Sequence, residues 1–323
     1  MRLVAKAEKW KLAEVFTISR GSRTETELVT VTLYDGTFEG RGECMANPRY
    51  NETQESVLAC IKKFDIDNQI DRQKLQILLP PCAARNAIDC ALWDLEAKRT
   101  GKRVTELFGI NKSTNLITAF TISADTPDKM ATAARRNSAR PLLKLKMSGD
   151  GDVDRVKAVR FGAPNARLIV DANEAWTEDM VEPLAKQLKA LGVEMIEQPL
   201  PKGADGALAN IPRIIPFCAD ESCHTSRDLK RLSGLYDIIN IKLDKAGGLT
   251  EALRLKKNAI AKGFKIMVGC MISTSLAMAP AYVVAHGAEY VDIDGPLLLA
   301  EDRMHGLEFA GSSVSPPSEF LWG

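Results

Sequence analysis

The chain has 323 residues, of which 45% are hydrophobic and 26% are charged, as in ordinary globular proteins. Lysine and arginine number 43 and aspartate and glutamate 42, so a formal net charge of +1 gives no electrostatic basis for binding nucleic acid or an anionic membrane. No apolar run approaches the ~18 residues of a membrane span, and the charged N-terminal residues argue against a signal peptide. We therefore expect a globular chain of about two domains with neither nucleic acid nor membrane as a partner.

The cysteine and histidine residues show no disulfide or zinc pattern. The seven cysteines include no C-x-x-C pair, and their odd number does not suit a disulfide framework. His224, His286 and His305 are not spaced as a ligand pair, which makes zinc chemistry a poor candidate. Scattered, reduced thiols are typical of a cytoplasmic protein, and we expect that location.

The first part of the chain, residues 1–112, carries mixed α and β signals. Residues 27–34 and 37–44 are apolar segments on either side of Asp35-Gly36, a pair that favours a two-residue hairpin turn. This pattern, together with the helices described next, predicts an α+β domain.

Two helices are expected in the same part. Asn51 is a candidate cap for a helix over residues 52–64, and a longer helix is predicted to start near Pro81 and to end at Gly101. The final segment, 296–323, contains three prolines and short apolar runs. We expect it to return to the N-terminal part and to complete the sheet there.

From about residue 116, short apolar runs alternate with amphipathic segments. The last residues of these eight runs follow one another at intervals of 22 to 27 residues: Thr121, Lys146, Asp171, Glu197, Asp220, Lys242, Gly269 and Asp294. Eight strands, each followed by room for one helix, predict a (β/α)₈ barrel. An open doubly wound sheet is the alternative, but no G-x-G-x-x-G follows the first run, and eight repeats favour a closed sheet.

Three carboxylates end neighbouring strands of this predicted barrel. Asp171, Glu197 and Asp220 close the third, fourth and fifth strands, and the active sites of such barrels lie at these strand ends. Converging carboxylates repel one another unless a cation joins them, and hard oxygen ligands favour Mg²⁺ over zinc. A lone aspartate at a strand end is usually a helix cap, but three adjacent carboxylates predict a magnesium site.

Lysines flank the predicted carboxylate cluster. Lys144 and Lys146 are two residues apart on the second strand, so both point into the barrel mouth, and Lys242 does so from the sixth strand. Lys245 is expected on the following loop, and Glu221 is expected to face outward. A neighbouring lysine, partial desolvation and a nearby Mg²⁺ would lower a lysine pKa from about 10.4 toward that of a proton acceptor.

This combination of side chains suits one class of reaction. A base on each face of a cavity, with a metal ion for an enolate oxygen, would remove a proton α to a carboxylate and return it from the other side. The residues by themselves therefore predict proton abstraction next to a carboxylate.

The order of the motifs resembles the enolase superfamily, in its muconate-lactonizing branch, over nearly the whole chain. The matching segments are AARNAIDCALWDLEAKRTGK, LKLK, IVDANEAW, EQPL, ADES and NIKLDKAGGLTEAL. The resemblance implies an α/β fold with a (β/α) barrel, a modified TIM barrel, over residues 113–295. An N-terminal α+β capping domain would cover residues 1–112 and be completed by about 296–323. Within the branch, the chain is most similar to epimerases of L-Ala-D/L-Glu dipeptides.

The resemblance also implies roles for particular residues. Asp171, Glu197 and Asp220 would bind one Mg²⁺ per subunit, and Lys146 and Lys242 would be the two acid/base catalysts of a 1,1-proton transfer. The substrate-binding residues that it implies are Arg23, Thr121, Lys144, Cys270, Met271, Ile272, Asp292 and Asp294.

Among these residues, three bear on the choice of substrate. Asp292 and Asp294 match a D-x-D motif that would hold the free ammonium of a dipeptide. Arg23, expected in a loop after the first strand, would face the glutamate side chain. Lys144 would contact the substrate carboxylate and help to depress the pKa of Lys146. The implied setting is murein-peptide recycling in the cytoplasm, with a small dipeptide as the partner; a homo-oligomer is compatible with the sequence.

Three interpretations remain open. The first is a dipeptide epimerase. The second is a muconate cycloisomerase or an N-acylamino-acid racemase/o-succinylbenzoate synthase, whose substrates lack the free ammonium that D-x-D would bind. The third is a metal-binding barrel without catalysis, which the intact lysines and carboxylates argue against. One departure from the family pattern is the segment NSARPLLKLK, which lacks the glycine usual before Lys144.

Overall fold

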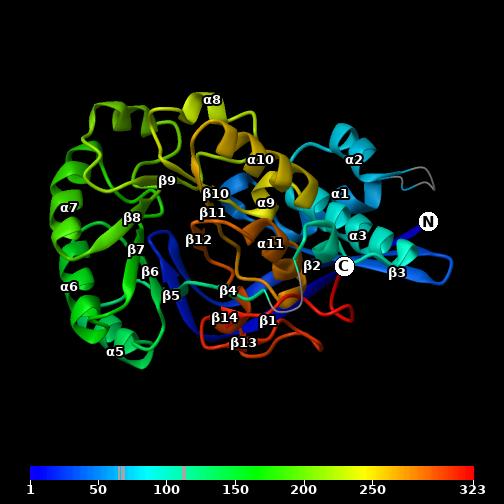
Figure 1. Ribbon diagram of the computed structural model, residues 1–323, viewed down its shortest axis with the longest axis horizontal. Helices are drawn as coiled ribbons and strands as arrows, with labels where there is room; N and C mark the ends of the chain where they lie inside the picture. The colour runs from blue at the N-terminus through cyan, green and yellow to red at the C-terminus, as the bar shows by residue number, and fades with distance from the viewer. Residues whose placement is uncertain (65, 67–69, 111–113) are drawn as a thin grey trace.

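The computed structural model describes residues 1–64, 66, 70–110 and 114–323 (Figure 1). The expected domain boundary at residues 112 and 113 lies outside the described residues. The described part contains a three-stranded N-terminal sheet, an eight-stranded parallel sheet and a second small antiparallel sheet. Within it, no helix combines the length and the apolar character needed to cross a membrane.

The N-terminal sheet is an antiparallel meander of β1 (Arg2–Ile18), β2 (Gly21–Asp35) and β3 (Phe38–Met45). The predicted hairpin between β2 and β3 is present, but its turn lies one residue later, because Asp35 pairs with Phe38 and leaves Gly36 and Thr37 in the turn. The sequence-based prediction missed β1. This edge strand alternates exposed, often charged side chains with half-buried ones, a pattern that is typical of a strand with one solvated face.

The rest of the N-terminal part that the structure describes is mainly helical. Its helices are η1 (Pro48–Tyr50), α1 (Gln54–Lys63), α2 (Arg72–Leu78), α3 (Ala83–Thr100) and α4 (Val104–Leu107). Of these, α1 and α3 pack on the sheet. Helix α3 ends at Gly101, as predicted. Helix α1 begins later than predicted: Thr53 caps it and exchanges hydrogen bonds with Ser56, whereas Asn51 ends η1 in the left-handed conformation. The capping hydroxyl, two residues further on, therefore fixes the start of α1.

The core of the N-terminal domain lies between the sheet and α3, where Val31 and Ile88 are among the fully buried side chains. The helix backbone approaches β3 very closely. A Cβ atom at Gly40 or Gly42 would lie 2.2 or 2.1 Å from a helix carbonyl oxygen. Glycine is required at both positions because any larger residue would push the helix away from the sheet.

The barrel strands pair in parallel and in chain order. They are β5 (Phe120–Ile122), β6 (Leu142–Lys146), β7 (Arg167–Asp171), β8 (Val193–Glu197), β9 (Phe217–Ala219), β10 (Ile238–Ile241), β11 (Lys265–Val268) and β12 (Tyr290–Val291). The backbone N–H of Ala119 donates to the carbonyl of Val291 at 2.7 Å, so the two edges of the curled sheet meet. The predicted eight-stranded barrel fold is confirmed.

The connections between the strands are mostly helical. They are α5 (Pro127–Arg136), α6 (Asp152–Gly162), α7 (Glu178–Ala190), η2 (Asp205–Asn210), α8 (Leu229–Leu232), α9 (Leu243–Ala246), α10 (Leu249–Ala261), α11 (Ser275–Ala285) and η3 (Gly295–Leu298). After β8 the chain forms only the 3₁₀ turn η2 where one helix had been expected. Figure 1 shows α5, α6 and α7 along the outer side of the barrel, away from the capping domain.

The C-terminal segment does not join the N-terminal sheet as expected. Instead β13 (Phe309–Ala310) and β14 (Ser313–Val314) form a separate sheet with β4 (Leu116–Ile117), which is the beginning of the first predicted barrel run. The segment still returns to the capping domain through an isolated bridge between Leu12 and Leu299. In addition, the indole N–H of Trp322 donates to the carbonyl of Cys90 at 3.0 Å. The C-terminal segment therefore contributes to the capping domain mainly by packing rather than by strand pairing.

Candidate active site

Inside the barrel, a layer of apolar side chains forms a floor below the site. This layer consists of Ala119, Leu142, Ile169, Met195, Cys218, Ile238, Met267 and Tyr290. Side chains two positions apart on a strand share a face, so the next layer also points into the barrel. That layer consists of Thr121, Lys144, Asp171, Glu197, Asp220, Asn240, Gly269 and Asp292. The alternation along each strand therefore places a polar site directly above an apolar floor.

The three predicted metal ligands meet in this layer. Asp171, Glu197 and Asp220 are buried, and one oxygen atom of each lies within 4.8 Å of the others. A hard divalent cation binds oxygen at about 2.0–2.6 Å, so ligands on opposite sides of it lie about 4–5 Å apart. The spacing and chemistry of these carboxylates fit one such cation. Asn240 orients the cluster by donating a hydrogen bond to Oε1 of Glu197 at 2.7 Å.

Two lysines of β6 contact the carboxylates from one side. Lys144 Nζ lies 2.7 Å from Oε2 of Glu197 and 3.3 Å from Oδ2 of Asp171. Lys146 Nζ lies 2.6 Å from the same Asp171 oxygen. Both side chains therefore point into the barrel mouth, as the spacing of two residues predicts.

Two more lysines contact Asp220 from the other side. Lys242 Nζ lies 2.7 Å from its Oδ2 and Lys245 Nζ lies 2.6 Å from its Oδ1. Lys245 is not on a loop as expected but in the short helix α9, where the carbonyl oxygens of Cys223 (2.9 Å) and Asn240 (3.2 Å) also accept from its ammonium. Lys242 lines the cavity, whereas Lys245 is buried and does not line it.

The pKa values follow from these ion pairs. Burial opposes ionisation of Asp171, but the neighbouring ammonium groups, Lys146 first, outweigh it and lower the pKa of Asp171 to about 2. Burial and the negative charge of Asp171 raise the pKa of Glu197 to about 7. Burial also opposes the charge of Lys242, but Asp220 outweighs it and holds the pKa of Lys242 well above its usual value. The expected lowering of a lysine pKa, which depends on a nearby Mg²⁺ and a neighbouring lysine, stays a prediction; for Lys242 the nearest charge in the protein itself is the carboxylate of Asp220.

A cavity of about 330 Å³ opens above the cluster, and both domains line it. The predicted site residues on its wall are Arg23, Lys146, Asp220, Lys242, Cys270, Met271 and Ile272. Lining residues that the sequence analysis did not identify include Phe16, Ile18, Arg20, Asn173 and Tyr50. The capping domain therefore forms the roof of the cavity, and the barrel forms its floor.

Arg23 is a half-buried cation above this cavity. It lies in β2 opposite Phe16 of β1, rather than in the loop where it was expected. Within the described part of the chain, its guanidinium has no carboxylate partner; burial, and then the nearby Arg20, lower its pKa. A partly desolvated cation without a counter-ion is suited to binding an anionic group of a ligand.

Arg20 holds the turn between β1 and β2 against the barrel. Its guanidinium donates to the carbonyl of Asn173 at 2.8 Å and to Oε1 of Glu221 at 2.9 Å. The prediction that Glu221 faces outward is wrong: its side chain is buried and lines the cavity. Strand β9 ends at Ala219, so Glu221 lies beyond the strand, where the alternation of faces no longer applies. Burial and Asp220 raise the pKa of Glu221 to about 7.

The D-x-D motif lies beside the lysines of β6. Oδ2 of Asp292 is 2.8 Å from Lys144 Nζ, while its buried Oδ1 has no hydrogen-bond partner among the residues that the structure describes. The backbone N–H of Thr121 donates to Oδ2 of Asp294 at 2.7 Å. Burial and the charge of Asp292 raise the pKa of Asp294 to about 7. In the described part of the chain, Oδ1 of Asp292 is therefore a buried acceptor atom without a donor.

The missing glycine before the second barrel strand does not disturb the site. Pro141 precedes β6, and its carbonyl oxygen accepts a hydrogen bond from Arg167 at the start of β7. From Leu142 to Lys146, every residue of β6 pairs with β7. Lys144 therefore keeps the position that the strand register gives it.

The chain matches known protein families over most of its length. Residues 1–109 match the mandelate racemase/muconate lactonizing enzyme N-terminal domain, and residues 129–318 match the enolase C-terminal domain-like family. An L-Ala-D/L-Glu epimerase of Escherichia coli K12 is 45% identical over 94% of this chain and 95% of its own. An N-acetyl-D-glutamate racemase of Pseudoalteromonas is 44% identical over 92% of this chain and 95% of its own.

A solved structure extends these similarities to the fold. An enolase family member from Agrobacterium tumefaciens, with homology to dipeptide epimerases, contains bound sodium and L-Ala-L-Glu. It is 51% identical to this chain and superposes with a TM-score of 0.97 over 99% of each chain. Because the relatives are epimerases and racemases, the protein is an isomerase, and with both family domains in their expected order the chain belongs to the enolase superfamily.

Proposed function

We propose that the protein is an epimerase of dipeptides of the L-Ala-D/L-Glu type. The observation that carries the proposal is that Lys146 of β6 and Lys242, which directly follows β10, line one cavity. Strands β7, β8 and β9 separate them, so each lysine approaches a bound substrate from a different side. Such a pair supplies one acid/base group to each face of a carbon atom, as a 1,1-proton transfer requires.

In this mechanism the two lysines exchange roles with the direction of reaction. Nζ of one lysine accepts the α-proton of the C-terminal residue, and Nζ of the other donates a proton to the opposite face. Lys144 has a different part. It is 1% exposed, contacts Asp171, Glu197 and Asp292, and does not line the cavity that Lys146 and Lys242 line. Burial opposes its charge, but Asp292 and Glu197 outweigh it and hold its pKa well above the usual value. We infer that it offsets negative charge on the substrate carboxylate rather than moving a proton.

We also propose one Mg²⁺ per subunit, held by Asp171, Glu197 and Asp220. When bound, the cation would supply positive charge to the substrate carboxylate and to the enolate formed from it. The support is the buried set of three hard oxygen ligands within 4.8 Å of one another. Asp171 has a pKa of about 2, and the pKa of Asp220 lies well below its usual value. Burial opposes ionisation of both carboxylates, but the adjacent lysines outweigh burial. Both are therefore anionic at neutral pH and available as ligands.

The charges around the cavity match those of an acidic dipeptide. Arg23, without a counter-ion, would bind the side-chain carboxylate of the C-terminal glutamate. Asp292 and Asp294 would receive the N-terminal ammonium, for which Oδ1 of Asp292 is a free acceptor. The remaining substrate contacts that we propose are Thr121, Cys270, Met271 and Ile272.

Racemisation of an N-acylated amino acid is the second candidate. Two observations favour it: the Pseudoalteromonas relative is named an N-acetyl-D-glutamate racemase, and Asp294 has a pKa of about 7 because of burial and Asp292. A protonated Asp294 would be a neutral neighbour for an acyl group instead of an anion for an ammonium. The free Oδ1 of Asp292 supports the dipeptide as the better candidate. No observation favours muconate cycloisomerase, o-succinylbenzoate synthase or a non-catalytic barrel.

Deuterium exchange tests the proposed reaction directly. The wild-type protein with Mg²⁺ is incubated in D₂O with a dipeptide library and with N-acetylglutamate, and deuterium at the α-carbon is measured by mass spectrometry and NMR. We expect L-Ala-L-Glu to gain one deuterium at the glutamate α-carbon and to yield the L-Ala-D-Glu epimer. The double variant K146A/K242A is the control without either base. Exchange of N-acetylglutamate in preference to every dipeptide would make the second candidate the function.

The proposed reaction fits a role in murein-peptide recycling in the cytoplasm, with a small dipeptide as the partner. The division of the chain into a capping domain (1–112, completed by 296–323) and a barrel (113–295) belongs to the same proposal. The recycling role is tested by the deuterium-exchange profile of the dipeptide library, in which murein-type Ala-Glu dipeptides should be preferred over unrelated ones.

A further inference from the structure

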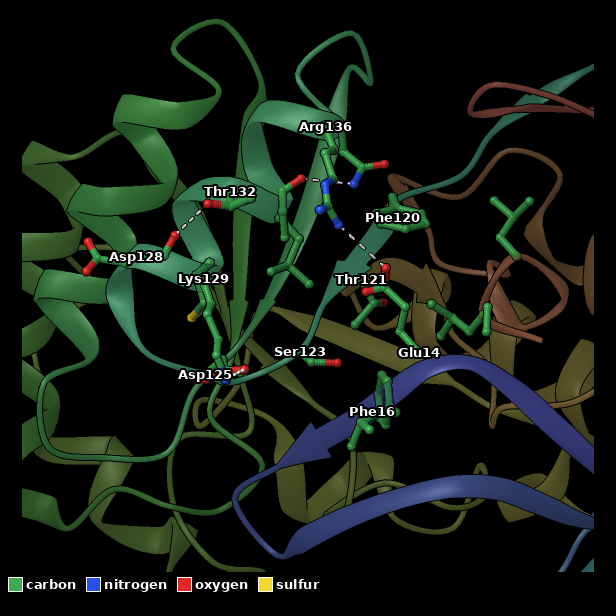
Figure 2. Close-up of a pocket in the computed structure, with 18 residues that line it drawn as sticks. Glu14, Phe16, Phe120, Thr121, Ser123, Asp125, Asp128, Lys129, Thr132 and Arg136 are labelled. Carbon is green, nitrogen blue, oxygen red and sulfur yellow. Dashed lines mark hydrogen bonds and ion pairs between the residues drawn. The ribbon is translucent and has the colours of Figure 1, made fainter. Parts of the chain in front are cut away.

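Figure 2 shows a second cavity, of about 530 Å³. It shares the lining residue Phe16 with the catalytic cavity. It is enclosed by β1 of the capping domain and by β5, α5 and η3 of the barrel. None of the residues assigned to catalysis or metal binding lines it. We call it the outer cavity.

Phe16 separates the two cavities, because its side chain lines both of them. On the catalytic side, its ring centroid is 6.0 Å from Nζ of Lys146. The ring also packs in one apolar cluster with Ile272, a predicted substrate contact, and with Leu298, which lines the outer cavity. Phe16 therefore forms a wall with the catalytic base on one side and empty volume on the other.

The outer cavity adjoins the end of the site that would hold the amino end of the substrate. Thr121 lines it, and the N–H of Thr121 donates to Asp294 of the proposed ammonium site. The side chain of an amino-acid residue branches from the carbon that bears its ammonium. A dipeptide whose ammonium lies at the D-x-D motif thus carries its N-terminal side chain close to this wall.

We propose that Phe16 is a specificity-determining residue that restricts the N-terminal residue of the substrate to a small side chain such as that of alanine. Behind the ring, the outer cavity is the space that a larger apolar side chain would occupy once the ring is removed. This inference rests on the proposed dipeptide epimerase function and adds the substrate's N-terminal preference to it.

The walls of the outer cavity suit an apolar side chain. Ile122 and Met130 are buried, and Phe120 and Ala133 are half-buried among its inner lining. Charged residues lie at its exposed side, where Figure 2 shows Arg136 of α5 directed at Glu14 of β1, 3.7 Å apart. Both of these side chains are mainly solvent-exposed, so the charged groups do not oppose burial of an apolar group further in.

Substitution of Phe16 tests the inference through the ratio of kcat/KM values for two dipeptide substrates. The ratio of kcat/KM for L-Leu-L-Glu to that for L-Ala-L-Glu is measured by deuterium exchange in the wild type, F16L and F16A. We expect a low ratio in the wild type and a rise of at least about tenfold in F16A, with F16L between them, as differences of a few methylene groups produce. Circular dichroism establishes that each variant is folded, and F16L gives the same test if F16A is not.

Two further variants test whether the leucine side chain of the substrate enters the outer cavity and whether a larger cavity alone changes the ratio. Phe120→Leu enlarges the outer cavity without opening the wall, so its ratio should stay at the wild-type value. In the F16A background, Ala133→Phe fills the outer cavity and should abolish the gain for L-Leu-L-Glu. An unchanged ratio in folded F16L and F16A, or a gain that survives Ala133→Phe, would overturn the inference while leaving the epimerase proposal intact. If the wild type fails to exchange L-Ala-L-Glu, the proposed function and this inference fail together.

Discussion

Lys245 and Asp220 form an ion pair that is closed off from solvent. Nζ of the lysine lies 2.6 Å from Oδ1 of the aspartate, and the two side chains are 1% and 2% exposed. Lys242 contacts the other oxygen of the same carboxylate but reaches the cavity. Lys245 thus holds Asp220 in place, whereas Lys242 lies beside Asp220 at the cavity. We therefore assign a structural role to Lys245 and a catalytic role to Lys242.

The two lysines should differ in what their loss affects. Lys245→Ala removes the enclosed cation from Oδ1 of Asp220 and from the backbone carbonyls of Asp220, Cys223 and Asn240, so we expect the free energy of unfolding to fall by about 3–5 kcal/mol. In Lys242→Ala, Asp220 keeps Lys245 as its partner, and we expect a smaller loss of stability but no epimerisation. Urea unfolding and turnover of L-Ala-L-Glu measure the two effects. An active Lys242→Ala variant would contradict the assignment of Lys242 as a catalyst.

Single substitution of each base should produce exchange that depends on the epimer. If Lys146 and Lys242 serve opposite faces, Lys146→Ala should retain α-proton exchange for one epimer and lose it for the other, and Lys242→Ala should show the reverse. Conversion between epimers should fall by at least about 10²–10⁴-fold in both. NMR of L-Ala-L-Glu and L-Ala-D-Glu in D₂O distinguishes these outcomes. Equal loss of both exchanges in each variant would mean that one lysine serves both faces.

Metal removal should stop the reaction. EDTA is expected to abolish turnover by the wild type, and added Mg²⁺ should restore it. Asp220→Asn leaves only two carboxylates, too few to hold Mg²⁺ well, so Mg²⁺ should not restore activity in this variant. Turnover and Mg²⁺ binding by calorimetry are measured together. Full activity in metal-free buffer would exclude the proposed magnesium site.

Asp294 should decide between free and acylated substrates. A charge-assisted contact with an ammonium contributes about 1.5–3 kcal/mol, or one to two powers of ten in affinity. The wild type should therefore favour L-Ala-L-Glu over N-acetyl-L-Ala-L-Glu. Asp294→Asn should lower kcat/KM for the free dipeptide and narrow that preference. Equal rates with both compounds in the wild type would favour N-acylamino-acid racemisation instead.

Asp244 should make stability depend on pH. This buried carboxylate of α9 accepts hydrogen bonds from the side chain of Asn86 (2.9 Å) and the backbone of Met45 (3.1 Å), both in the capping domain. Burial raises its pKa from 3.8 to about 7, so between these values the folded state holds a proton that the unfolded state releases. Stability from this group is complete below pH 4 and is lost as the pH rises toward and through 7.

The matching variant for this effect is Asp244→Asn, which keeps an oxygen acceptor but cannot ionise. Between pH 5 and 8, the wild type should lose about 2–3 kcal/mol more unfolding free energy than the variant, at 1.36 kcal/mol per pKa unit. Urea titrations of both proteins at the two pH values give the difference. Identical pH dependence in the two proteins would show that Asp244 does not titrate in this range.

The strand ends were predictable because a barrel strand alternates strictly between faces. An apolar residue on the inner face, such as Ile169 or Met195, fixes the direction of the residue two positions later, here Asp171 and Glu197. Outside the strands this rule no longer applies, which is why the directions of Glu221 and Lys245 were predicted wrongly or not at all.

Close packing between distant segments was not predictable. Gly269 ends a barrel strand like its neighbours, but a Cβ there would lie 2.7 Å from Oδ1 of Asn240 and 3.0 Å from Cε of Lys242. The need for glycine depends on two side chains from another segment, one in β10 and one directly after it. The roof of the cavity, including Arg20 and Phe16, belongs to a hairpin whose first strand was missed because its solvated face is charged.

The lysine-rich site has a consequence for how its ligands bind. Buried lysines contact buried carboxylates throughout the site: Lys144, Lys146, Lys242 and Lys245 lie against Asp171, Glu197, Asp220 and Asp292. A divalent cation bound among these groups would add positive charge to a region of low dielectric, and a substrate carboxylate would offset part of that charge. Cation and substrate should therefore bind with positive thermodynamic coupling, each raising the affinity for the other by the same factor.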